Sequence, residues 1–416
     1  MLFLPRWSVA PPGVGTVRRA NFRLVQLDAV ALGITAAATP FVAVFLIRAG
    51  ASPFEIGLLT TLPAVAGLLL SIPIGEWLQG QRNIVPALNH GRLLATAGFV
   101  VTGLISLFAP RDLIVPAVVL VWAAVSIPQA VTMVTFAIVM EGVAGPGGRY
   151  ELMTRRWSLI GLTNAIAIAI TGVVLDRLGF PLGYQVVFIG LPLTAIVSFV
   201  VIGRVRLPAR DVRPRPTTPM RERIRGYGEL LRDRPAFVGF TLRQLVYTLG
   251  TRMALPLVPL YYVQAIGASD AWIGLFASIQ AFLVLVGYLI WHRQFRSRGG
   301  RFVLLATTLV GVVQPAVLPF IGGVIAVAVV AGVTGIATAG LNLVFFDELM
   351  KTIPAANAPL FVAVNQNAQN LAGIIGPTAG AIVVGAAGIR WGLGISAVLS
   401  GLGFLLFLRD TRRETH

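Results

Sequence analysis

Two charged residues and one band of amides lie inside stretches of this chain that are otherwise apolar. Asp28 and Arg252 each interrupt a long apolar run. The amide band lies in FVAVNQNAQNL, residues 361–371, where Asn and Gln fill five of the six positions from 365 to 370. If these runs cross a membrane, each polar group is costly unless it is paired, and each therefore needs a partner or a function.

Asp28 shares a helix face with two hydroxyl groups. At about 100° per residue, Thr35 and Thr39 fall close to the line of its carboxylate. A carboxylate well inside a membrane span can take up and release protons, so we predict that Asp28 couples solute movement to a proton gradient. The alternative is a structural carboxylate that pairs with an arginine near the inner interface, such as Arg23 or Arg243.

Arg252 lies near the middle of its apolar run, on the same face as Pro256 and Pro259. A guanidinium at mid-membrane costs on the order of 2.5 to 3.5 kcal/mol and does not readily lose its proton. It must therefore meet water, carbonyls, a carboxylate or an anionic solute. We predict that Arg252 faces a cavity and binds the negative or polar part of a solute. The alternative is that it binds carbonyls freed at a helix break made by the prolines.

Side chains that could contact a solute recur at helical spacing on two further runs. We predict that they line the same cavity, together with Thr35 and Thr39. Aromatic stripes more often pack against neighbouring helices, which is the alternative. The residues concerned are Trp122, Gln129 and Phe136 on one run and Asn342 on the other.

The amides cover an arc of about 200° on a helical wheel, so at least half of this turn must face protein or water. We predict that they form an uncharged latch with Gln79 at an inner gate, with solute binding as the alternative. Glu141 and Glu348 end two runs at the same side and are predicted to anchor this gate through salt bridges to Arg149 and its basic neighbours. The amides are Asn365, Gln366, Asn367, Gln369 and Asn370.

Composition places these residues in an integral membrane protein. The chain is 56% hydrophobic and 12% charged, with a mean hydropathy of +0.84. It has no cysteine, and its three histidines are scattered without ligand spacing, so we expect neither a metal site nor a cofactor. No Ser/His/Asp spacing, nucleophile elbow or phosphate-binding glycine loop is present, and we do not expect an enzyme.

Twelve segments are long enough to cross a hydrocarbon core of about 30 Å, and none shows the period-2 alternation of a membrane β-barrel. Their many glycines favour close helix packing, as in Gly376-x-x-x-Gly380. The predicted class is an all-α protein with twelve transmembrane helices. The segments are 23–47, 55–78, 92–109, 114–141, 156–175, 184–203, 237–264, 272–292, 302–320, 323–348, 361–386 and 389–408.

Basic residues set the predicted orientation. With both termini inside, the inner connections hold 27 Arg and Lys residues and the outer connections hold four. This bias is the positive-inside pattern of a multi-pass protein of the cell membrane with cytoplasmic termini. The net charge of +17 is therefore a topology signal, and we expect no nucleic-acid partner.

The two halves of the chain resemble each other. RAGASPFEIGLL at 48–59 recurs as AIGASDAWIGLF at 265–276, which is the weak internal symmetry of a transporter built from two parallel six-span halves. We predict bundles at 1–203 and 237–416, joined by a basic linker at 204–236. RERIRGYGELLRD in this linker could form an amphipathic surface helix or stay a solvated tether.

Twelve spans in two sixes, a basic central loop and inside termini resemble the major facilitator superfamily across essentially the whole chain. In its signature loop, GEWLQGQRN keeps Gly75 and a displaced Arg82, while Gln79 stands at the aspartate position. The resemblance implies two pseudo-symmetric six-helix bundles around a central cavity. It also implies that the first, fourth, seventh and tenth spans line that cavity.

We therefore predict secondary active transport of a small organic solute by alternating access, coupled to protons through Asp28. One alternative is export of amphipathic or drug-like compounds. Another is a transporter-like sensor or scaffold without net flux. The expected partners are the solute, the lipid bilayer and protons, and we expect a monomer.

Overall fold

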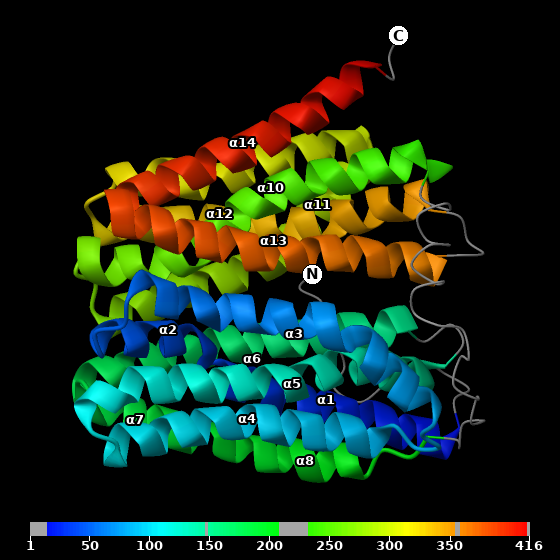
Figure 1. Ribbon diagram of the computed structural model, residues 1–416. Coiled ribbons are helices and arrows are strands. Elements are labelled where there is room, and N and C mark those ends of the chain that lie inside the picture. Colours follow the sequence, from blue (N-terminus) through cyan, green and yellow to red (C-terminus); the bar gives the residue numbers. More distant parts are fainter. Residues whose placement is uncertain (1–14, 146–148, 208–231, 354–357, 414–416) are drawn as a thin grey trace. The chain divides into compact units, whose positions relative to one another are not determined.

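The computed structural model describes residues 15–145, 149–207, 232–353 and 358–413 (Figure 1). Every regular element in these ranges is a helix, which confirms the predicted all-α class for the part of the chain described. The segment RERIRGYGELLRD lies outside the described residues except for its last two. Its predicted surface helix stays a prediction.

Contacts divide the chain into two units. The first comprises Met1–Phe45 and Leu69–Arg215, and the second comprises Leu46–Leu68 and Pro216–His416. Helix α3 contributes to both. The helices up to the linker are α1 (Thr16–Ala36), α2 (Thr39–Arg48), α3 (Pro53–Gln79), α4 (Val85–Phe108), α5 (Arg111–Ala144), α6 (Arg149–Leu178), α7 (Leu182–Gly190) and α8 (Thr194–Gly203).

The helices after the linker all lie in the second unit. Helix α11 is interrupted at Gly299, whose φ of 81° and ψ of 165° are not helical, at the place where the sequence predicts a connection between spans. The elements are α10 (Pro235–Leu260), a π-helical turn (Tyr261–Ala265), α11 (Asp270–Val317), α12 (Val324–Thr352), α13 (Ala358–Ala387) and α14 (Ile389–Arg413).

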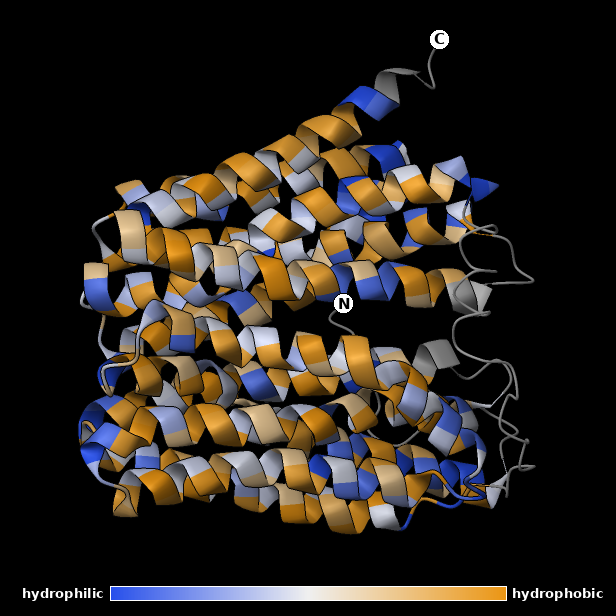
Figure 2. Ribbon diagram, viewed as in Figure 1, coloured by the Kyte–Doolittle hydropathy of each residue, from blue (hydrophilic) through white to orange (hydrophobic). Residues whose placement is uncertain are grey.

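Ten segments of the described chain are long and apolar enough to cross a membrane. The longest, Asp270–Phe320, has 51 residues, about twice what one crossing requires. Helix α10, which carries Arg243 and Arg252, is not among the ten. Apolar residues run along the helices in both units, as helices between lipid and protein require (Figure 2). The predicted count of twelve spans stays a prediction.

The core of the first unit includes an aromatic cluster. The ring of Phe45 from α2 lies 5.6 Å from that of Phe188 and 5.5 Å from that of Tyr184, both from α7. Phe99 of α4 packs edge-on against Trp122 of α5 at 5.0 Å. The first two contacts join α2 and α7, which are far apart in the sequence, and the third joins the consecutive helices α4 and α5.

Glycines bring α13 and α14 close to α10 in the second unit. A methyl group placed on Gly376 would lie 2.9 Å from the carbonyl oxygen of Leu249 and 3.1 Å from Cβ of Arg252. One placed on Gly380 would lie 3.0 Å from the carbonyl oxygen of Met253. The close packing predicted for Gly376-x-x-x-Gly380 is confirmed.

Residues 46–68 group with the second unit because the start of α3 packs on α13. A methyl group on Gly57 would meet the carbonyl oxygen of Pro377 at 3.4 Å, and one on Gly67 would meet Nδ2 of Asn370 at 3.1 Å. The guanidinium of Arg48 also donates to Asp270 at the start of α11, at 2.8 Å.

We predict that Gly376→Val lowers the free energy of unfolding by about 1 to 3 kcal/mol, because the added carbons would push α13 away from the backbone of α10. The matched control is Gly385→Val on the same helix, where a methyl group would meet nothing within 4 Å. Thermal unfolding of the detergent-purified variants measures the difference. Equal unfolding temperatures would contradict the packing argument.

Candidate functional site

A cavity of about 440 Å³ lies within the second unit. Four helices, α10, α11, α12 and α13, supply its walls. Its polar lining residues are Gln244, Tyr247, Thr248, Thr251, Arg252, Gln280, Gln314, Thr334, Thr338, Asn342, Gln366 and Gln369, and its apolar ones include Leu255, Leu341 and Phe345. The predicted solute contacts Arg252 and Asn342 both line this cavity.

Arg252 carries the one formal charge among these lining residues. Its side chain is exposed, and no hydrogen bond or ion pair joins it to any residue that the structure describes. Helix α10 continues through Pro256 and Pro259 to Leu260, so the prolines do not end the helix beside Arg252. The predicted role in solute binding stays a prediction, which this lack of a partner supports.

Several neutral groups in the cavity also have hydrogen bonds left to make. The phenol oxygen of Tyr247 and Nε2 of Gln369 are buried without a partner among the described residues. The hydroxyls of Thr334 and Thr338 donate to the carbonyls of Val330 and Thr334 at 2.8 Å, which leaves their oxygens free to accept. The cavity therefore offers both donors and acceptors to a solute.

The amide band on α13 divides between internal pairing and the cavity. Asn365 is buried and donates to Oε1 of Gln244 on α10 at 2.8 Å. Gln366 and Gln369 line the cavity, and Gln366 also donates to Asn370 at 3.4 Å. Asn367 is half-buried. These placements support the alternative of solute binding for part of the band.

Gln79 is exposed at the end of α3, in the portion that belongs to the first unit. Asn370 of α13 lies against Gly67 of α3. Gly67 precedes Gln79 by 12 residues, which is about 18 Å along a helix. The latch between Gln79 and the amides stays a prediction.

Of the other predicted gate residues, Glu348 pairs within its own helix and Glu141 lies in the first unit. Glu348 and Asp347 each pair with Lys351 of their own helix, at 2.8 and 2.7 Å. Glu141 is exposed and lines a separate cavity of about 320 Å³ in the first unit, with Arg82. The side chain of Arg149 lies outside the described part of the chain.

Asp28 is fully buried at the centre of a charge cluster in the first unit. Arg92 of α4 donates to both carboxylate oxygens, at 2.8 and 2.9 Å, and Arg156 of α6 donates to one of them at 2.6 Å. Ser198 of α8 donates to the other at 2.5 Å. The carboxylate therefore joins four helices. Its arginine partners are Arg92 and Arg156, not the expected Arg23 or Arg243, and Arg243 pairs with Asp410 at 2.7 Å.

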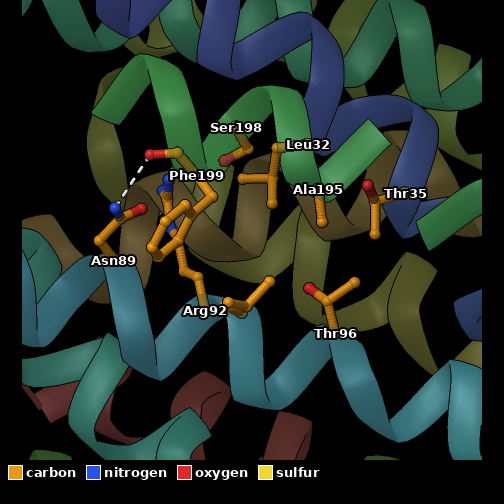
Figure 3. A pocket seen from close by; sticks show the side chains of 9 residues that line it. Leu32, Thr35, Asn89, Arg92, Thr96, Ala195, Ser198 and Phe199 are labelled. Atoms are coloured by element: carbon orange, nitrogen blue, oxygen red, sulfur yellow. Dashed lines mark hydrogen bonds between the residues drawn. The ribbon is translucent and has the colours of Figure 1, made fainter. Parts of the chain in front are cut away.

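This cluster holds two guanidiniums against one carboxylate, and Arg156 is only 1% exposed. Removing the central charge would leave two buried like charges facing each other, so the carboxylate has a structural function whatever else it does. A small cavity of about 10 Å³, room for about one water, adjoins Arg92 and Ser198 (Figure 3). Thr35 lines this cavity and is buried.

The remaining predicted contacts are placed in the first unit. Trp122 is buried and donates its indole N–H to Thr102 at 3.2 Å, as packing requires. Phe136 lies under the guanidinium of Arg156 at 5.3 Å. Gln129 is half-buried, and Thr39 is exposed at the first position of α2, beyond the turn that ends α1. Their role as solute contacts stays a prediction.

Sequence reasoning missed Gln244, Tyr247, Gln280 and Gln314 as lining residues. The glutamines could have been found by the argument applied to the amide band, because each is a carboxamide inside an apolar run. Tyr247 carries no such signal, because tyrosines are common in helix cores.

The sequence model described as Major Facilitator Superfamily matches residues 240–416. A mutant of the nucleoside transporter NupG has a similar structure, with a TM-score of 0.71 and 12% identity over 95% of this chain and 99% of that chain. The predicted resemblance to this superfamily is confirmed. A comparison with curated proteins gives no match.

Two other solved structures have a similar fold. A bacterial homologue of the iron transporter ferroportin, in an inward-facing state, has a TM-score of 0.73 and 12% identity over 95% of this chain and 99% of that one. A bacterial homologue of the human lysosomal transporter Spinster, inward-facing and unoccupied, has a TM-score of 0.67 and 15% identity over 97% and 98%. At these identities the likeness concerns the fold. The superfamily match begins on α10 and includes every helix that lines the 440 Å³ cavity.

We predict that Asp28→Asn lowers the free energy of unfolding by about 3 to 5 kcal/mol, because it leaves Arg92 and Arg156 buried without their shared counter-charge. Asp176→Asn, at an exposed position of α6, is the matched control and should change stability little. Thermal unfolding measures both. An Asp28→Asn protein that keeps its stability but loses pH-driven solute uptake would instead support the proton-coupling role.

Proposed function

We propose that this chain is a secondary transporter that moves a small organic solute across the membrane by alternating access. The observation that carries the proposal is the 440 Å³ cavity of the second unit, whose lining holds the unpaired charge of Arg252 among neutral hydrogen-bonding groups. Such a volume lies within the range of about 300 to 1,000 Å³ of small-molecule sites. The superfamily match and the transporter folds of the neighbours support the same class.

In this proposal the chain crosses the membrane twelve times as two six-helix bundles. Counting α10 as a span, and the two parts of α11 before and after Gly299 as separate spans, extends the ten apolar segments to twelve. Both termini lie in the cytoplasm of a cell whose membrane holds the protein, as the distribution of arginines favours. The solute, the bilayer and protons are the proposed partners.

The cluster around Asp28 holds the first unit together in this proposal. If Asp28 took up a proton, the buried guanidiniums of Arg92 and Arg156 would lose their shared counter-charge. A proton cycle at Asp28 is therefore costly. We therefore assign the coupling role to Asp28 only if its neutral variant stays folded. The cavity of the second unit carries the solute.

Alternating access predicts that a cavity residue becomes reachable by water from both sides in turn. The chain has no cysteine, so single-cysteine reporters need no prior substitution. Thr338 lines the cavity and lies equally far from both ends of α12. In sealed vesicles of known orientation, we expect an impermeant thiol reagent to label Thr338→Cys from either side.

Two control cysteines define the limits of this measurement. Ser297→Cys lies at an exposed site next to the interruption of α11 and should label from one side only. Leu289→Cys, at a side chain 68% exposed within an apolar segment, should resist labelling because lipid keeps its thiol un-ionised. Labelling of Thr338→Cys from one side alone would contradict alternating access and favour the sensor or scaffold.

A further inference from the structure

The donors left unpaired in the 440 Å³ cavity indicate what its solute must offer. Arg252 provides N–H groups, Gln369 provides Nε2 and Tyr247 provides its phenol O–H, none of them bonded to a described residue. Tyr247 is only 1% exposed. Buried polar atoms without partners are rare in native proteins and require a ligand, an ion or water. Tyr247 and Gln369 therefore call for acceptors, and the exposed guanidinium of Arg252 offers further donors to the solute.

The charge of the lining sets the charge of the solute. Arg252 is the one formally charged residue among the described lining residues, and no carboxylate offsets it there. A carboxylate fits a guanidinium in a bidentate pair and neutralises one positive charge. A phosphate monoester would bring a charge of about −1.5 to −2 at neutral pH. The balance favours a monocarboxylate, and it disfavours cations, which would find no counter-charge.

The body of the solute is defined by the neutral groups. Tyr247 and Arg252 are five residues apart on α10, which corresponds to about 7.5 Å along the helix axis. Because their side chains leave the helix in different directions, a solute that contacts both must carry a second acceptor apart from its carboxylate. The oxygens of Thr334 and Thr338 accept, and the amide of Gln280 both donates and accepts. Hydroxyl groups, which also donate and accept, match this surface.

We propose that the cavity binds a polyhydroxylated organic monocarboxylate, with the carboxylate on Arg252 and hydroxyl oxygens on Tyr247 and Gln369. This inference rests on the proposed function, because it takes the cavity to be the solute site. Arg252 provides the preference for an anion, and Tyr247 provides affinity for the hydroxylated body.

The test compares four probes that share one hexose ring and differ in charge: D-glucuronate, D-glucose, D-glucosamine and D-glucose 6-phosphate. Calorimetric titration of the full chain in lipid nanodiscs measures their dissociation constants. We expect D-glucuronate to bind at least about tenfold more tightly than D-glucose, because a charge-assisted pair adds to the hydroxyl contacts. Tighter binding of D-glucosamine or D-glucose 6-phosphate, or no binding by any probe, would overturn the assignment.

Variants test the contributions of Arg252 and Tyr247 to binding separately. Arg252→Gln should reduce the affinity for D-glucuronate to that for D-glucose, and Arg252→Lys should reduce it less, since it keeps the charge. Tyr247→Phe should weaken both probes. Arg243→Gln is the matched control, because Arg243 lies on α10 outside the cavity lining and pairs with Asp410. An unchanged preference for D-glucuronate in folded Arg252→Gln would also overturn the assignment.

The outcome can be told apart from a failure of the proposed function. Labelling of Thr338→Cys depends on movement of the cavity between two exposures and not on which solute binds. Labelling from both sides with no binding of D-glucuronate would reject this solute class and leave the transporter standing. If Arg252→Gln does not fold, the ranking of the four probes on the unmodified chain and the Arg252→Lys variant still decide.

Discussion

A bilayer interior supplies no hydrogen bonds, and under this constraint Asp28 and Arg252 have opposite surroundings. Asp28 is fully enclosed, and each of its carboxylate oxygens accepts hydrogen bonds from protein donors. Arg252 makes no such bond to a described residue and instead lines a cavity. The same physical requirement thus produces a closed charge cluster in one unit and a polar cavity in the other.

The closed cluster has a cost that the rest of the first unit offsets. Burying three ionised groups carries a desolvation penalty of several kcal/mol each, and the attraction between the paired charges offsets only part of it. The aromatic packing of Phe45, Phe99 and Trp122 supplies apolar burial in the same unit and shares helix α4 with the cluster. Because four helices meet at one carboxylate, a shift of any of them strains the cluster. This arrangement suits a rigid unit better than a site that must exchange its proton.

The cavity of the second unit depends on the glycines of α13 and α14. Gly376 and Gly380 let α13 approach the backbone of α10, and Gly403 does the same for α14, where a methyl group would lie 2.5 Å from Cα of Tyr247. Both contacts adjoin cavity residues, because a methyl group on Gly376 would lie 3.1 Å from Cβ of Arg252 and the one on Gly403 would lie beside Tyr247. The close packing therefore fixes the part of α10 from which these two residues line the cavity.

The all-helical class and the long apolar segments were predictable from the sequence because apolar length is a strong signal in membrane proteins. The partners of Asp28 were not, because Arg92 and Arg156 stood at the edges of predicted segments 92–109 and 156–175 and were counted as inner connections. The structure extends these helices to Val85 and Arg149, which brings both guanidiniums inside. The mean hydropathy of a span falls at such an arginine, so the sequence pattern predicts that the helix ends there. In the structure the helix continues past the arginine. Arg252 escaped this error because apolar residues lie on both sides of it. A charge within an apolar run is thus easiest to place from the sequence when it stands alone, which is also when it is most free to bind a solute.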